Sequence, residues 1–74
     1  MGRAMILRHL TRARERVAQG ERHLKLQQKI VDLLQRDGRD ALHARKLLQQ
    51  YQELLARHIA DRDRLERDLS ETQV

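Results

Sequence analysis

The 74-residue chain contains no cysteine, no proline, no phenylalanine and no tryptophan. Without cysteine it has neither disulfides nor thiolate metal sites. Tyr51 is the only aromatic residue, so leucine, isoleucine, valine and alanine must form the core. A chain of this length buries a marginal core, which usually needs disulfides, a metal or oligomerisation to supplement it. Self-association is therefore the first expectation.

Long apolar runs are also missing. No stretch approaches the ~20 apolar residues of a membrane-spanning helix. The segment Met1–Leu10 lacks the long apolar core and small-residue cleavage site of a secretory signal. We therefore expect a cytoplasmic protein with no membrane span.

The charge is abundant and unevenly distributed. Charged residues make up 36% of the chain and the net charge is +5. Residues 1–25 carry seven basic and two acidic side chains, a net +5, whereas residues 51–74 carry four basic and six acidic ones, a net −2. If the chain folds back on itself, these oppositely charged ends meet and much of the basic excess is neutralised within the fold.

One strong helix breaker divides the chain. The segment Asp37-Gly38-Arg39-Asp40 lies between two helical patterns of similar length. Gly38 suits the left-handed conformation that ends a helix, and Asp40 is placed to accept from the free N–H groups that begin the next one. We predict a single domain, residues 1–74, with helix 1 at about 3–36, a turn at 37–40 and helix 2 at about 41–71.

Apolar residues recur with a seven-residue repeat in both arms, which is typical of helices that pack at a shallow angle. The predicted fold is all-α: two long antiparallel helices forming a coiled-coil-like helical hairpin. Its facing core residues have numbers that sum to about 75, so Gly20 faces Leu55 and Leu10 faces Leu65. Layers far from the turn include His58 and Arg62, so we expect the free ends to splay or fray.

A second apolar stripe lies beside the first in the half near the turn. Leaving several large aliphatic side chains exposed is unfavourable, since each is worth roughly 1.5–3 kcal/mol when fully buried. We therefore predict a homodimer that forms a four-helix bundle. The residues assigned to self-association are Leu26, Ile30, Leu33, Leu42, Leu47 and Leu54.

Part of the sequence is similar to a known group of proteins. The residues that carry the similarity are Gly20-Glu21-Arg22-His23, Gln28, Ile30-Val31, Leu34, Asp37-Gly38, Ala44, Leu47-Leu48, Tyr51, Leu54 and His58 to Leu65. Over about residues 17–69 the chain resembles short helical-hairpin proteins common in rhizobia and related alphaproteobacteria. The resemblance implies a hairpin of bacterial origin and no activity or site residues.

The surroundings of the polar residues at core positions indicate structural roles for them. His58 has Asp61 three residues on but no further ligand at helical spacing, and zinc needs three or four convergent ligands. We interpret His58 as a polar core-line residue that pairs with Asp61 or water. Gln27 and Tyr51 occupy neighbouring layers, which indicates a buried hydrogen bond that sets the register rather than a polar pocket.

Nothing in the sequence indicates catalysis. The aliphatic hydroxyls are Thr11, Ser70 and Thr72, none with a base placed to activate it, and no phosphate-binding glycine loop is present. In the second arm, Asp63 and Arg67 have the spacing of a helical ion pair. We predict a protein that is not an enzyme and has no cofactor or metal.

The basic first arm leaves alternatives open. Arg8, Arg12 and Arg16 have the spacing of one helical face that could follow a phosphate backbone. Pairing with the acidic end of the second arm is the simpler interpretation, because no aromatic stacking platform accompanies these arginines. The leading hypothesis is a structural or protein-interaction module that self-associates or binds a further protein. The alternative is a small dimeric nucleic-acid-binding regulator, and a third is a membrane-surface helix at Met5–Val17.

Overall fold

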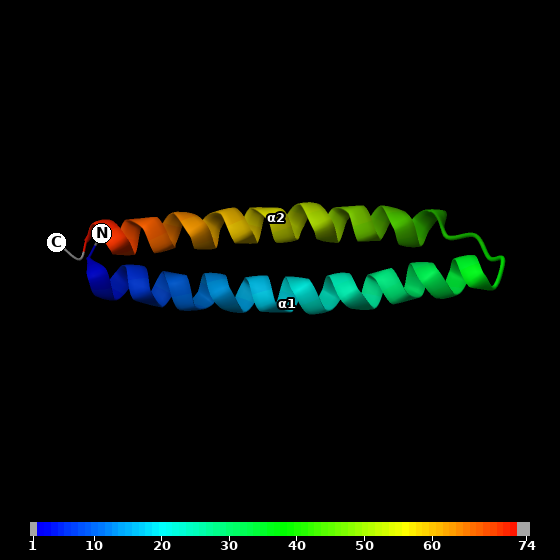
Figure 1. Cartoon of the computed structure of the whole chain (residues 1–74), viewed down its shortest axis with the longest axis horizontal. Coiled ribbons are helices and arrows are strands. Elements are labelled where there is room, and N and C mark those ends of the chain that lie inside the picture. The colour runs from blue at the N-terminus through cyan, green and yellow to red at the C-terminus, as the bar shows by residue number, and fades with distance from the viewer. Residues whose placement is uncertain (1, 73–74) are drawn as a thin grey trace.

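The computed structural model describes residues 2–72 of the chain, and residues 1, 73 and 74 of the predicted domain lie outside this range. The chain forms two α-helices, α1 (Arg3–Arg36) and α2 (Leu42–Glu71), which lie antiparallel along a hairpin 57 Å long (Figure 1). The start of α1 and the end of α2 lie side by side at the end opposite the turn. The predicted all-α helical hairpin is confirmed, and α2 begins one residue later than expected.

A glycine in the left-handed conformation ends α1. Gly38 has φ 68°, a value that costs residues with a Cβ atom about 1 kcal/mol or more. This conformation lets the Arg39 N–H donate to the Leu34 carbonyl at 2.8 Å, while the Gly38 N–H donates to the Gln35 carbonyl at 3.2 Å. These two bonds form a Schellman motif and satisfy carbonyls that the end of a helix would leave free.

The side chain of Asp40 binds the start of the second helix. Its Oδ1 accepts from the backbone N–H of Leu42, the first residue of α2, at 2.9 Å. The carboxylate therefore satisfies a free donor and also places a negative charge at the positive end of the helix. The sequence interpretation of Asp40 is confirmed.

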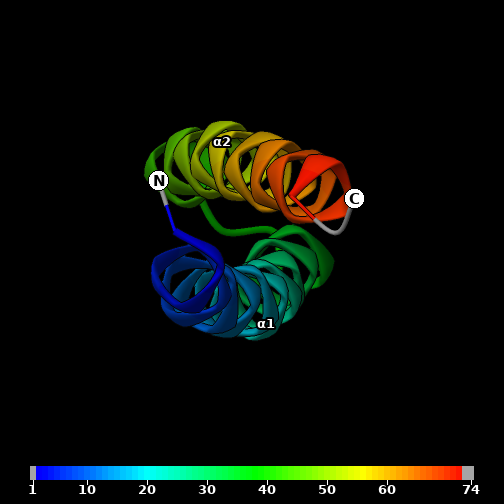
Figure 2. The ribbon, with the colours of Figure 1, turned by 90° about the vertical axis from the view of Figure 1, so that its left-hand side faces the viewer.

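The helices pack in the predicted register. A Cβ atom added to Gly20 would lie 3.0 Å from Cδ1 of Leu55, so the helices approach closely at this layer because Gly20 has no side chain. Towards the open end, Leu10 packs with Leu65 in a buried cluster. Seen along its length, the hairpin has helices that are inclined to one another rather than strictly parallel (Figure 2).

The expected fraying of the open half is wrong. Both helices continue side by side to the open end, from Arg3 in α1 and to Glu71 in α2 (Figure 1). The most completely buried residues of the chain also lie in this half. Leu10 and Ala13 are each 1% exposed, and Leu69 packs on their cluster. The layers that follow Arg62 towards the open end are filled by the large side chains of Leu10, Leu65 and Leu69, so a single arginine does not open the helices.

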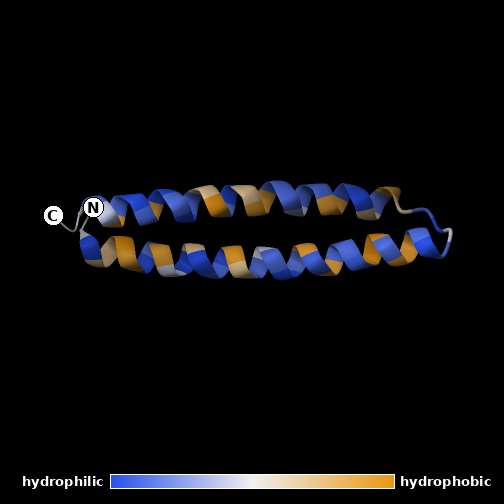
Figure 3. Ribbon diagram, in the orientation of Figure 1, coloured by the Kyte–Doolittle hydropathy of each residue, from blue (hydrophilic) through white to orange (hydrophobic). Residues whose placement is uncertain are grey.

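The half near the turn buries less of its apolar surface. Apolar residues recur along both helices in Figure 3, but many of those near the turn are exposed. Leu26, Ile30, Leu33, Leu42 and Leu54 are 44% to 60% exposed. The hairpin alone therefore leaves part of the predicted second stripe in contact with water. Neither described helix has an apolar stretch long enough to cross a membrane.

Candidate functional site

Two shallow grooves open along one side of the hairpin. The larger, about 320 Å³, lies in the open half, and the smaller, about 140 Å³, lies around Gly20. Arg16 lines both, so they share one side of α1. We call this side of the molecule the groove flank. It includes the residues that lie at seven-residue steps from the residues lining the grooves, because such steps return to the same side of a helix. The lining residues on α1 are His9, Arg12, Arg16, Gln19, Gly20 and His23; those on α2 are Tyr51, Leu54, Leu55, His58, Asp61, Arg64, Leu65 and Asp68.

Most of the exposed stripe lies on the groove flank. Ile30 follows the groove-lining His23 by seven residues, and Leu26 follows Gln19 by the same interval. A seven-residue step returns to nearly the same side of an α-helix, within about 20°. Leu33 continues the line after Leu26, so three exposed aliphatic side chains extend along α1 towards the turn.

The facing line on α2 is also apolar near the turn. Leu54 lines the smaller groove, and Leu47 precedes it by seven residues. Leu47 is half-buried, so it contributes both to the hairpin core and to this surface. We call Leu26, Ile30, Leu33, Leu47 and Leu54 the apolar patch.

Leu42 does not join the apolar patch. It precedes Leu47 by five residues, and at about 100° per residue that places it some 140° around the helix. Its exposed side chain therefore lies on the other flank of α2, next to the turn. Five of the six residues assigned to self-association share one surface, and Leu42 stands apart.

The open half of the groove flank is charged. Arg12 and Arg16 line the larger groove together with two carboxylates, Asp61 and Asp68. Asp61 accepts from Arg64 at 2.6 Å. Arg8 does not line this groove, and its Nη2 lies 3.6 Å from the sulfur of Met5. The three arginines of the predicted basic face are thus divided, and the two in the groove have acidic neighbours.

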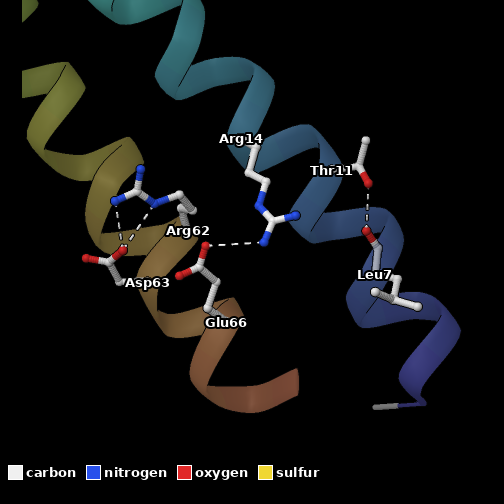
Figure 4. Close-up of polar contacts among 6 residues, drawn as sticks. All are labelled: Leu7, Thr11, Arg14, Arg62, Asp63 and Glu66. Carbon is white, nitrogen blue, oxygen red and sulfur yellow. Dashed lines mark hydrogen bonds and ion pairs between the residues drawn. The ribbon is translucent and has the colours of Figure 1, made fainter. Parts of the chain in front are cut away.

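The opposite flank carries an ion pair between the helices. Arg14 Nη2 lies 3.4 Å from Glu66 Oε1, and both side chains are largely exposed (Figure 4). An exposed pair of this kind is worth about 0–1 kcal/mol. The basic and acidic arms therefore meet as expected, but their pairing adds little stability.

Gln27 provides the buried polar contact between the helices. Its side chain is 7% exposed, and Nε2 donates to the backbone carbonyl of Ala44 at 2.9 Å. The predicted buried hydrogen bond that sets the register is therefore present, and its acceptor is a backbone carbonyl of α2. Tyr51 instead lies against His23, with ring centroids 6.0 Å apart. His23 is a neighbour that sequence reasoning missed, although its place seven residues after Arg16 put it on the same line.

Replacing Gln27 by alanine should lower the free energy of unfolding by about 1–3 kcal/mol, because the substitution removes a buried hydrogen bond and leaves a void. The adjacent Gln28 is the matched control, since its amide bonds only to the exposed Asp32 of the same helix. Gln28→Ala should change stability by no more than about 0.5 kcal/mol. Urea unfolding followed by circular dichroism measures both, and equal effects would contradict the role of Gln27.

Two side-chain pairings differ from those expected. Asp63 Oδ1 accepts from Arg62 at 3.0 and 3.1 Å, rather than from Arg67 (Figure 4). The guanidinium of Arg62 leaves its core position and folds outward onto its neighbour, because a buried charge needs a partner. Of the two partners expected for His58, Asp61 and water, Asp61 pairs with Arg64 instead. His58 lies half-buried in the smaller groove.

The described residues, 2–72, include no group of three or more His, Asp or Glu side chains arranged to hold a metal ion. The hydroxyls of Thr11 and Thr72 donate to carbonyls of their own helices, those of Leu7 and Leu69 (Figure 4 shows the first). The chemistry that the groove flank offers is therefore apolar contact near the turn and mixed charge near the open end.

No family model, curated protein sequence or solved structure matches the chain.

Proposed function

We propose that the protein is a non-enzymatic interaction module that binds a second copy of itself through the apolar patch and forms a four-helix bundle. The observation that carries this proposal is the placement of five aliphatic side chains on one flank of the half near the turn, four of them 44% to 60% exposed. A contiguous exposed apolar surface on a small protein is typical of an interaction site.

The free energy available supports association. Burying the exposed half of a leucine or isoleucine is worth about 1 kcal/mol, by the usual area relation. A symmetric dimer buries each of the five residues twice, so the gross gain is roughly 10 kcal/mol before the entropy of association is subtracted. The hairpin itself has a thin core with a single buried layer between its helices. Association therefore supplies burial that 74 residues do not provide alone.

The charges favour a protein partner over nucleic acid. Arg12 and Arg16 share their groove with Asp61 and Asp68, and a phosphate backbone laid there would meet these carboxylates. Nucleic-acid-binding surfaces gather positive charge on one face. The mixed charge of the groove instead resembles the polar part of a protein interface, where opposite charges pair across the contact.

The molar mass in solution tests the proposal. Sedimentation equilibrium at micromolar concentration is expected to give twice the chain mass of 8.8 kDa. A mass of one chain, with the helical circular dichroism of a folded hairpin, would refute self-association.

A further inference from the structure

We infer that the two copies lie parallel, with both turns at the same end, and that they meet along the full length of the groove flank. This inference rests on the proposed self-association and specifies its geometry. Three arrangements of two hairpins are compatible with a twofold axis: parallel, antiparallel with full overlap, and antiparallel with only the halves near the turns overlapping. These three arrangements differ in which surface of the second copy covers the apolar patch.

The area of contact favours full overlap. The Cα atoms of the hairpin extend over 57 × 14 × 13 Å, so one broad side covers about 800 Å². Two such sides in contact bury about 1,600 Å² in total, the standard size of a stable interface. Overlap of only the halves near the turns buries about half of that, which is less than the ~1,000 Å² expected of a specific interface.

Full antiparallel overlap places unlike halves together. The apolar patch of one copy would cover the open half of the other, where Arg12, Arg16 and Asp61 line the groove. Burying charges beneath leucine and isoleucine side chains costs several kcal/mol for each ion. This arrangement also leaves the patch without an apolar partner.

The parallel arrangement places apolar residues against apolar residues near the turn and brings the arginines of α1 to the height of the partner's aspartates near the open end. Arg64, which also lines this groove, is already paired with Asp61 of its own chain. Turning one copy about an axis along the hairpin places α1 opposite the partner's α2 and keeps every layer at its own height. Because facing residue numbers sum to about 75, as Gly20 with Leu55 and Leu10 with Leu65 show, Asp61 lies at the height of position 14. Along the hairpin axis, the partner's Asp61 would therefore lie midway between Arg12 and Arg16 of the first copy.

Distances between spin labels on the two copies test the arrangement. The chain has no cysteine, so Arg3→Cys and Arg39→Cys each introduce one labelling site, at exposed positions near the open end and in the turn. In the parallel dimer both label pairs are separated by roughly 20–30 Å, the width of a four-helix bundle with helices ~10 Å in diameter. In a fully overlapping antiparallel dimer both distances approach the hairpin length of 57 Å. With only the turn halves overlapping, the distance at position 3 exceeds that length.

Sedimentation of the same labelled samples separates the two proposals. A dimer with short distances at both positions supports the parallel arrangement. A dimer with a distance near or above the hairpin length at position 3 overturns the arrangement and leaves self-association intact. A wild-type chain that is monomeric under the same conditions overturns both. Dilution with unlabelled protein should weaken the signal, because every measured distance is between copies. The molar mass of the same samples distinguishes a dimer from a larger aggregate.

Discussion

Replacing Leu47 and Leu54 by aspartate is expected to convert the proposed dimer into a single 8.8 kDa chain. Each substitution removes about 1 kcal/mol of burial and places a carboxylate in the contact, at a further cost of about 1–3 kcal/mol. Over the four altered positions of a dimer, the total is roughly 8–16 kcal/mol, an upper bound because the carboxylates can turn towards water. We expect the dissociation constant for the dimer to rise by at least about 10³-fold.

The matched control is the pair Gln49→Asp and Ala56→Asp. These exposed residues are also seven apart on α2 and gain the same negative charge, but they lie on the other side of the helix from Leu47 and Leu54. The control should remain dimeric at the same concentration. If both double variants have the same mass, or if only the control dissociates, the apolar patch is not the contact surface. Circular dichroism of each variant establishes whether the hairpin is still helical.

Leu10→Ala is expected to cause the largest loss of stability of any single substitution considered. Leu10 is 1% exposed and packs with Ala13 and Leu65, so its truncation leaves a cavity that neighbouring backbone cannot fill. Such substitutions cost about 2–5 kcal/mol. In a domain of this size that lowers Tm by roughly 10 °C or more.

Leu7→Ala provides the control for Leu10. The two leucines lie three residues apart in α1, but Leu7 is 41% exposed and belongs to neither the buried cluster nor the apolar patch. Its truncation should cost less than about 1 kcal/mol. Thermal unfolding of the three chains at one concentration measures the difference, since Tm of a dimer depends on concentration. A Leu10 variant as stable as the Leu7 variant would mean that the open end is frayed in solution.

The turn and the register were predictable because each depends on local chemistry. Gly38 has a positive φ, and Asp40, two residues on, accepts from the first N–H group of the next helix; both roles follow from residue type. Once the turn is known, the seven-residue repeat leaves one register that buries the apolar line. Gly20 opposite Leu55 follows from that register alone.

The polar partners and the extent of the patch could not be predicted in the same way. Arg62 pairs with Asp63 because its long side chain can turn out of the core, a choice between rotamers that spacing does not decide. Polar residues such as Arg62 in the core line predict fraying of the open end, but the large side chains that follow it towards the chain ends hold the helices together. Leu42 and Leu47 are both apolar and near the turn, but five residues of α-helix place their side chains on different flanks of α2.

The position of the buried cluster has a consequence for folding. Leu10 and Leu65 are 55 residues apart in the sequence, whereas Val31 and Ala44 beside the turn are 13 apart. Closing the longer loop costs about 1 kcal/mol more in chain entropy. The contacts that form most readily are thus those that bury least, and the contacts that bury most must wait for the chain ends to meet. We expect a hairpin built in this way to fold in an all-or-none manner, without a stable intermediate in which only the turn half is formed.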